Sequence, residues 1–231
     1  MTDSPARGLL PGPLALVGGG EWTDGCTFDE ALWQQSGRAE VLVLPTAAAY
    51  EHPQRAVETA REWFARFGAE VAPLMVLSRR DALEEATADR IRSAPFIYLS
   101  GGSPMHLRSV LKDTPAWSAL VEAWRAGAVV AGSSAGAMVL GDSMVDPRGG
   151  ALTLGLGLVA RVAFMPHYDT WSEEKAHRTV QLATGHLRIA AVDERTALVR
   201  SPEGNWTAAG AGKVTVFVDA SPAGLDALEG S

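Results

Sequence analysis

Short, continuously apolar runs alternate in the first half of the chain with longer segments that repeat apolar residues at helical spacing. Apolar runs at 14–17, 41–44, 71–77 and 96–99 are typical of strands that are buried on both faces. Helices are expected at 29–35, 53–67, 81–93, 104–112 and 117–125. This alternation predicts an α/β fold in which a mostly parallel central sheet carries helices on both faces, in three layers.

The pattern changes after Pro147. Residues 152–164 are apolar with spaced glycines, which suggests irregular chain and short strands, and a helix is expected at 172–184. Short strands are expected at 189–192, 196–200, 206–209 and 214–218, two of them joined as a hairpin by the turn 202–205. The tail after Asp219 is expected to fray. We expect one α/β domain over residues 1–231, with its core at about 14–219.

Composition narrows the class of protein. The 231 residues are 47% hydrophobic, which is ample for a large core, and the formal net charge of −7 argues against a nucleic-acid surface. No apolar run approaches the ~20 residues that cross a bilayer, and no signal peptide is evident before Leu14. The single cysteine, Cys26, cannot form an internal disulfide, which fits a cytoplasmic protein.

The segment Gly132-Ser133-Ser134-Ala135-Gly136 carries the strongest chemical signal. It follows the apolar run 126–131 and matches the G-x-S-x-G nucleophile elbow, with Ser134 at its centre. Such a turn, between a strand and a helix, exposes the serine hydroxyl beside free backbone N–H groups. The pattern therefore predicts Ser134 as a nucleophile.

A serine nucleophile needs a histidine base and a carboxylate that orients this base. His167 follows an apolar run, in a position typical of sites at strand ends, and His106, after Gly101-Gly102, is the second candidate. The other histidines are assigned to a loop, a solvated helix face and a helix end: His52, His177 and His186. Residue patterns alone leave the acid open among Asp142, Asp146, Asp169, Asp193 and Glu194.

An oxyanion formed at this serine needs two N–H donors. Ala135, directly after the nucleophile, supplies one, and the strand-end turn Gly101-Gly102 offers the other. The chemistry needs no metal and no organic cofactor. His167 and Asp169 are close in the chain but are too few for a structural metal site.

These pieces, in their order, resemble the serine-peptidase family of cyanophycinase and alpha-aspartyl dipeptidase (dipeptidase E). The resemblance runs from about Leu14 to Asp219. It is carried by Gly18-Gly19-Gly20-Glu21, Leu99-Ser100-Gly101-Gly102, Gly132 to Ala137, Pro166-His167-Tyr168 and Asp193-Glu194-Arg195-Thr196-Ala197. It implies a class I glutamine amidotransferase-like fold, which is flavodoxin-like, with serine in place of the amidotransferase cysteine.

The same resemblance implies roles for individual residues. Ser134 would be the nucleophile, His167 the base and Glu194 the third member, as in the cyanophycinase branch, with Asp146 held in reserve from the dipeptidase branch. Gly102 and Ala135 would donate to the oxyanion. Candidates for the substrate pocket are Gly101, Ser103 and Tyr168.

The implied activity is hydrolysis of a small peptide or amide, with aspartyl dipeptides as candidate substrates. Cyanophycinases carry an arginine-rich run after the histidine, whereas residues 168–174 are acidic here, which argues against the aspartate-arginine polymer. Cations for an aspartyl side chain could come from Arg108, Arg161, Arg178 or Arg195. The alternatives are a cyanophycinase-like exopeptidase and a non-enzymatic, ligand-binding relative. The oligomeric state stays open, with a homodimer as one candidate.

Overall fold

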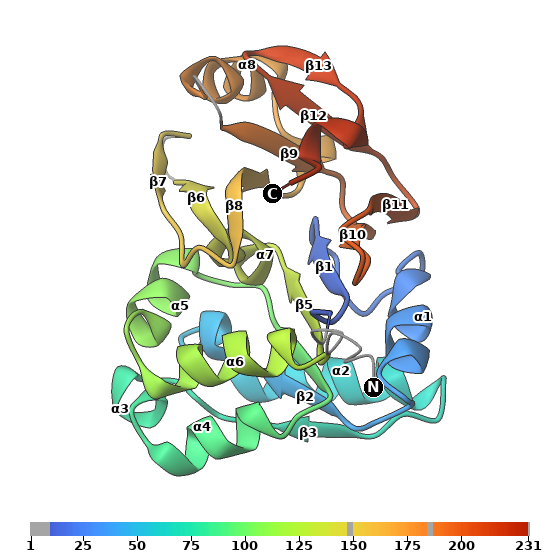
Figure 1. Ribbon diagram of the computed structural model, residues 1–231, viewed down its shortest axis with the longest axis vertical. Helices are drawn as coiled ribbons and strands as arrows, with labels where there is room; N and C mark the ends of the chain where they lie inside the picture. Colours follow the sequence, from blue (N-terminus) through green and yellow to red (C-terminus); the bar gives the residue numbers. More distant parts are fainter. Residues whose placement is uncertain (1–9, 147–149, 184–186, 231) are drawn as a thin grey trace, which may run out of the picture.

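The computed structural model of the protein describes residues 10–146, 150–183 and 187–230, and its strands form two sheets (Figure 1). The first sheet has seven strands, in the spatial order β11 (Trp206–Gly210), β10 (Thr196–Arg200), β1 (Leu14–Val17), β5 (Val129–Ser133), β4 (Phe96–Leu99), β2 (Val41–Leu44) and β3 (Val71–Pro73). Strands β1, β5, β4, β2 and β3 pair in parallel, and β10 and β11 add an antiparallel hairpin. The α/β class and the hairpin predicted from the sequence are confirmed.

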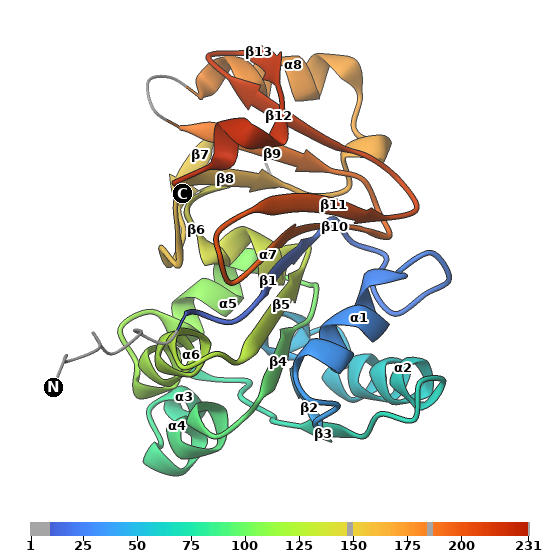
Figure 2. The ribbon, with the colours of Figure 1, turned by 45° about the vertical axis from the view of Figure 1, so that its right-hand side comes forward.

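Helices cover both faces of the first sheet, because successive side chains of its buried strands point to opposite sides. Ala15 and Val17 of β1 belong to a core shared with α1 (Phe28–Gln35) and α2 (Pro53–Ala65). Leu14 and Leu16 belong to the other core, which α5 (Pro104–Leu111) and α6 (Pro115–Arg125) cover together with α3 (Arg79–Ala82) and α4 (Glu85–Arg92). Figure 2 shows α1 and α2 on one side of this sheet and α3 to α6 on the other.

A second sheet, which the sequence did not separate from the first, stands beside the predicted central sheet. Its spatial order is β13 (Ser221–Ala223), β12 (Val214–Val218), β9 (Arg188–Val192), β8 (Val159–Met165), β6 (Gly141–Val145) and β7 (Leu152–Leu154). The buried helix α7 (Ala135–Leu140) carries the chain from β5 into β6, and α8 (Glu173–Leu182) packs beside this sheet (Figure 2). The short helices η1 (Thr46–Ala48), η2 (Tyr168–Thr170) and η3 (Leu225–Leu228) complete the fold.

Four local predictions need correction. The expected strand 71–77 ends at Pro73. Leu74 N–H still donates to Val43 O of β2, but the chain then turns, and Val76 N–H donates to Leu74 O. The expected helix 81–93 is divided into α3 and α4. Residues 152–164 hold the short strand β7 and most of the seven-residue strand β8, which lies parallel to both β6 and β9 and pairs with β6 through a register shift. Residues 220–230 are ordered, because β13 pairs with β12 and Leu228 of η3 is fully buried. The predicted end of the helix at 184 lies outside the described residues.

The carboxyl ends of β1, β4 and β5 meet at the junction of the two sheets, where β8 also ends (Figures 1 and 2). Parallel α/β sheets place their sites at such ends. Among the described residues, no helix has the length and apolar character needed to cross a membrane.

Candidate active site

Ser134 sits on a sharp turn between a strand and a helix. β5 ends at Ser133 and α7 begins at Ala135, and Ser134 between them has φ 47° and ψ −106°. Positive φ in a residue other than glycine is strained, and this strain is typical of a nucleophile elbow. A Cβ atom on Gly132 would lie 2.5 Å from the backbone carbon of Gly136, so the glycine spacing allows the turn to close.

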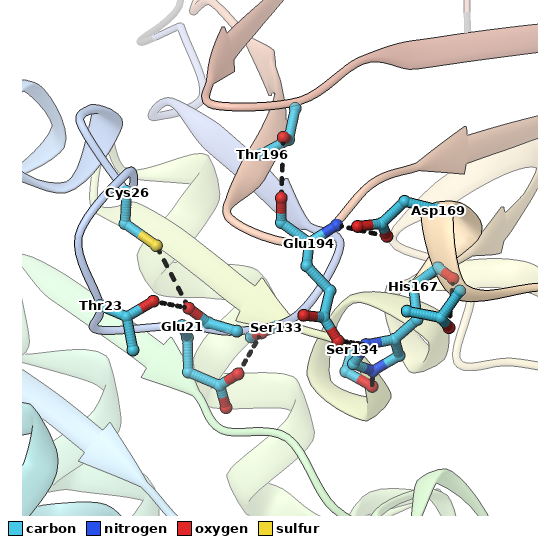
Figure 3. A network of polar contacts seen from close by, with 11 residues as sticks. Glu21, Thr23, Cys26, Ser133, Ser134, His167, Asp169, Glu194 and Thr196 are labelled. Carbon is cyan, nitrogen blue, oxygen red and sulfur yellow. Dashed lines mark hydrogen bonds and ion pairs between the residues drawn. The ribbon is translucent and has the colours of Figure 1, made fainter.

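The side chains of Ser134, His167 and Glu194 form a hydrogen-bonded chain (Figure 3). His167 follows β8, and its Nε2 lies 2.8 Å from Ser134 Oγ. Its Nδ1 lies 2.8 Å from Oε1 of Glu194, which belongs to the turn between β9 and β10. The histidine tautomer with hydrogen on Nδ1 accepts from the serine and donates to the carboxylate. The His167 and Glu194 side chains are each 35% exposed, so the chain opens to solvent.

The end of β1 holds these three segments in place through three successive carbonyl groups. The carbonyl of Val17 accepts from Ser134 N–H, that of Gly18 from His167 N–H, and that of Gly19 from the N–H of Arg195, next to Glu194. Asp169 adds a further link, because its Oδ1 accepts from Glu194 N–H at 3.0 Å. Segments far apart in the sequence thus meet at one strand end.

The reserve acid, Asp146, is not the partner of the His167 ring. Both ring nitrogens are already engaged, by Ser134 and Glu194, and Asp146 follows β6. Two other candidates have backbone partners elsewhere: Asp142 accepts from Arg161 N–H, and Asp193 accepts from Lys213 N–H.

The second candidate base, His106, lies outside this chain of hydrogen bonds. Its Nε2 is 3.0 Å from Leu77 O, and its ring packs edge-on against Tyr50. His52 precedes α2 and His177 lies on α8, both exposed, whereas His186 lies outside the described residues.

Two backbone N–H groups near Ser134, those of Gly102 and Ala135, lack a backbone acceptor among the described residues. In the turn after β4, Ser100 N–H donates to Leu44 O, Gly101 N–H to Glu21, and Ser103 N–H to Ala47 O. Within the described residues, Gly102 N–H has no such acceptor, and neither has Ala135 N–H. They are the N–H groups that the sequence analysis proposes as oxyanion donors, a role that stays a prediction. A serine activated by an imidazole beside free N–H groups is suited to acyl transfer.

A cavity of about 480 Å³ opens beside Ser134 and His167. Its walls include Gly102 and Ser103 from the predicted set, with Trp171 and Lys175 from the segment after His167. The predicted pocket residues Gly101 and Tyr168 do not line it. Gly101 lies against Glu21, and Tyr168 packs edge-on against Phe217, with ring centroids 6.2 Å apart.

Sequence reasoning missed two charged residues of this region. Lys175 lines the cavity, and its Nζ lies 4.0 Å from the centre of the Trp171 ring. Glu21 contacts both Gly101 and Ser133. The position of Glu21 directly after Gly18-Gly19-Gly20 at a strand end was the available signal, whereas nothing local distinguishes Lys175 from a surface lysine.

Cys26 belongs to the same neighbourhood without reaching the cavity (Figure 3). Its Sγ lies 3.4 Å from Gly20 O, and burial raises the pKa of the thiol to about 11. A thiol that stays protonated at neutral pH is a poor nucleophile, so Cys26 does not compete with Ser134.

Comparisons with known proteins agree with this geometry. The model of peptidase family S51 matches residues 14–205. A cyanophycinase of Synechococcus elongatus is 26% identical over 224 residues, covering 91% of this chain and 68% of the relative. The uncharacterized peptidase YgaJ of Bacillus subtilis (strain 168) is 29% identical over 167 residues, covering 68% of each chain. The crystal structure of a peptidase from an acI-B1 Actinobacterium superposes with a TM-score of 0.83 at 30% identity, covering 94% of each chain.

Proposed function

Because the chain belongs to peptidase family S51, we propose that it hydrolyses short peptides through Ser134, with His167 as the base and Glu194 as its orienting acid. The observation that carries this proposal is the continuous chain of two 2.8 Å contacts from Ser134 Oγ through the imidazole to Glu194. Its position at the wall of a 480 Å³ cavity supports the proposal, because small-molecule sites have volumes of this order.

In the first half of the reaction, Ser134 Oγ attacks the carbonyl carbon of the scissile bond while His167 Nε2 takes the hydroxyl proton. Glu194 stabilises the imidazolium through Nδ1–H. The carbonyl oxygen becomes an oxyanion that accepts from Gly102 N–H and Ala135 N–H. The C–N bond then breaks, and the leaving amine takes the proton from His167, which leaves an acyl ester on Ser134.

In the second half, water repeats the sequence. His167 takes a proton from a water molecule whose oxygen attacks the ester carbon, and the same two N–H groups stabilise the second oxyanion. The ester C–O bond breaks, Ser134 Oγ regains its proton from His167, and the acid product leaves. No net proton is gained or lost by the protein over the cycle.

The charge of the cavity favours a substrate with an anionic group on the acyl side, such as an aspartyl dipeptide. Lys175 is the only lysine or arginine among the described residues that line the cavity. No ion pair to Lys175 is found in the described part of the chain, so a substrate carboxylate could approach its Nζ. The four arginines considered from the sequence do not line the cavity.

A second candidate function is hydrolysis of the aspartate-arginine polymer, which the similarity to cyanophycinases favours. The segment after His167 carries Asp169, Glu173 and Glu174, where the sequence resemblance would require arginines. The aspartyl dipeptide is therefore the first substrate to test, and aspartyl-arginine conjugates are the second.

The nucleophile is tested by comparing the wild-type protein with Ser134→Ala. We expect a fluorophosphonate probe to label the wild-type protein at Ser134, and we expect the substitution to abolish labelling and lower turnover by about a millionfold. Ser133→Ala, which removes the neighbouring hydroxyl, should keep the label on Ser134. A wild-type protein that is not labelled, or a Ser134→Ala variant with full turnover, would support the non-enzymatic alternative or another nucleophile.

The substrate class is tested by Lys175→Met on a panel of α-aspartyl, β-aspartyl and neutral dipeptides. A hydrogen bond to a charged group contributes about 1.5–3 kcal/mol, so kcat/KM on the aspartyl substrate should fall about 10- to 150-fold. The value for a neutral dipeptide should stay within about threefold. Lys112→Met, on a surface lysine paired with Asp113, is the matched control. An equal loss on acidic and neutral dipeptides would show that Lys175 does not select the anion.

A further inference from the structure

Glu21 lies next to the candidate active site, and its carboxylate bridges the turn after β4 and the end of β5. The residue follows Gly18-Gly19-Gly20 at the end of β1, and its carboxylate is directed toward Ser133 (Figure 3). Oε1 accepts from Gly101 N–H at 2.8 Å, and Oε2 accepts from the Ser133 hydroxyl at 2.8 Å. Both oxygens are thus engaged by neighbours of the reacting groups rather than by the reacting groups themselves.

Gly101 precedes the expected oxyanion donor, and Ser133 precedes the nucleophile. Gly102 has φ +133°, a conformation open to glycine, and two successive glycines leave the peptide groups of this turn many alternative orientations. The bond from Gly101 N–H to Glu21 fixes the peptide group directly before the Gly101–Gly102 peptide. A rotation of the latter would turn Gly102 N–H away from the cavity.

The Glu21 carboxylate has no paired cation in the described part of the chain, which argues against a role as one half of an ion pair. In the part of the chain that the structure describes, no lysine or arginine forms an ion pair with Glu21. The ionisable groups on which its charge acts include Asp29 and Tyr98, which are acidic or neutral. What Glu21 supplies is therefore two acceptors in a fixed geometry.

We infer that Glu21 is a positioning residue that holds the Gly102 oxyanion donor at its working distance from Ser134. Its carboxylate ties the turn after β4 to the last residue of β5, so Gly102 N–H and the Ser134 hydroxyl keep one relative placement. This inference rests on the proposed function, because it assigns Glu21 a role only if Ser134 forms a tetrahedral intermediate.

Substitutions of Glu21 differ in which of its two hydrogen bonds they keep. Glu21→Leu has similar size but no acceptor, so Gly101 N–H loses its partner. Glu21→Gln keeps one acceptor for Gly101 N–H, and its NH₂ group can donate to Ser133 Oγ once that hydroxyl rotates. The amide should therefore rescue most of the function that leucine removes.

The experiment measures kcat, KM and the rate of fluorophosphonate labelling for Glu21→Leu, Glu21→Gln and Ser133→Ala. A displaced oxyanion donor acts on the transition state, so Glu21→Leu should lower kcat and the labelling rate about 100-fold, with KM within about threefold. Glu21→Gln should recover to within about fivefold of wild type. Glu30→Leu, which removes an exposed carboxylate from α1, is the matched control for the loss of one charge.

The outcomes separate this inference from the proposed function. If the wild-type protein is not labelled at Ser134, the proposed function fails. If it is labelled and Glu21→Leu is labelled at the same rate, only the role of Glu21 fails. An equal loss of activity in Glu21→Gln and Glu21→Leu, with a raised KM, would likewise overturn the positioning role. If Glu21→Leu does not fold, the double variant Glu21→Gln/Ser133→Ala replaces it. Without the Ser133 hydroxyl, the side-chain amide at position 21 can turn its NH₂ group toward Gly101 N–H. The fold loss of kcat in the double variant must therefore exceed the product of the losses in the two single variants.

Discussion

At the scale of single residues, the candidate site is organised around the end of one strand. Three successive carbonyls, of Val17, Gly18 and Gly19, accept the N–H groups of Ser134, His167 and Arg195. A side-chain triad needs its members held within fractions of an ångström, and backbone bonds provide this more rigidly than flexible side chains. The same geometry places Glu194, the neighbour of Arg195, beside the His167 ring.

Glu194→Gln should therefore lower kcat far more than Asp146→Asn. Replacing the carboxylate leaves His167 without the charge that stabilises its imidazolium, and the loss should reach about 10³- to 10⁴-fold. Asp146→Asn should stay within about tenfold, since both nitrogens of the His167 ring are already engaged. Steady-state kinetics on the best dipeptide of the panel ranks the two variants. The reverse ranking would assign the acid to Asp146.

At the scale of elements, the sequence best predicts those strands and turns whose burial is recorded in a short run of neighbouring residues. The continuous apolar runs define β1, β2 and β4 within their observed limits, because a strand covered on both faces leaves little choice of residue. The elbow is predicted for a similar reason, since the turn from β5 into α7 tolerates only small residues beside Ser134. These two signals were sufficient to predict where Ser134 and the Gly101–Gly102 turn lie.

Elements whose limits depend on distant partners were predicted poorly. The strand β8 has buried and exposed residues without alternation, because it pairs with β6 across an irregular register and with β9 beyond α8. The last residues are ordered because Leu228 is buried and its carbonyl accepts from the Trp206 indole. The division into two sheets, the wall supplied by Lys175 and the bridge through Glu21 all depend on contacts that no local pattern records.

The start of α3 is an instructive intermediate case. Ser78 and Asp81 form a capping box, with Ser78 Oγ accepting from Asp81 N–H and the Asp81 carboxylate accepting from Ser78 N–H. The cap begins the helix at Arg79, and a break before Glu85 then separates α3 from α4. The spacing from Ser78 to Asp81 can be recognised in the sequence. It predicts that the helix begins at Arg79, whereas the apolar periodicity alone predicts a start at Asp81.

At the scale of the whole molecule, one buried carboxyl links stability to pH. Asp29 lies on α1 and is fully buried, and its Oδ2 accepts from the indole of Trp63 on α2 at 2.9 Å. Burial raises its pKa well above the ordinary value of 3.8, and the nearby Glu21 charge adds to this shift. The native state therefore keeps a proton on Asp29 at pH values where the unfolded chain has lost it.

The sign of the effect follows from proton binding. Below pH 3.8 both states hold the proton, and the full stabilising contribution is present. As pH rises above this value, only the native state keeps the proton, so the free energy of unfolding falls by about 1.4 kcal/mol per pH unit. The fall continues until the pH passes the raised pKa of the native state. Ionisation of Asp29 in the unfolded chain thus lowers the stability of the entire fold.

Asp29→Asn tests this linkage because the amide keeps the shape and an acceptor for Trp63 but cannot ionise. Urea unfolding of both proteins from pH 5 to pH 8 should show the variant gaining stability relative to wild type as pH rises, by about 1.4 kcal/mol per unit below the native pKa. Other titrating groups affect both proteins alike, so they cancel in this difference. Glu30→Gln, which removes an exposed carboxylate from the same helix, controls for the change in net charge. A stability difference between Asp29→Asn and wild type that stays constant across the pH range would mean that Asp29 is already ionised in the native core.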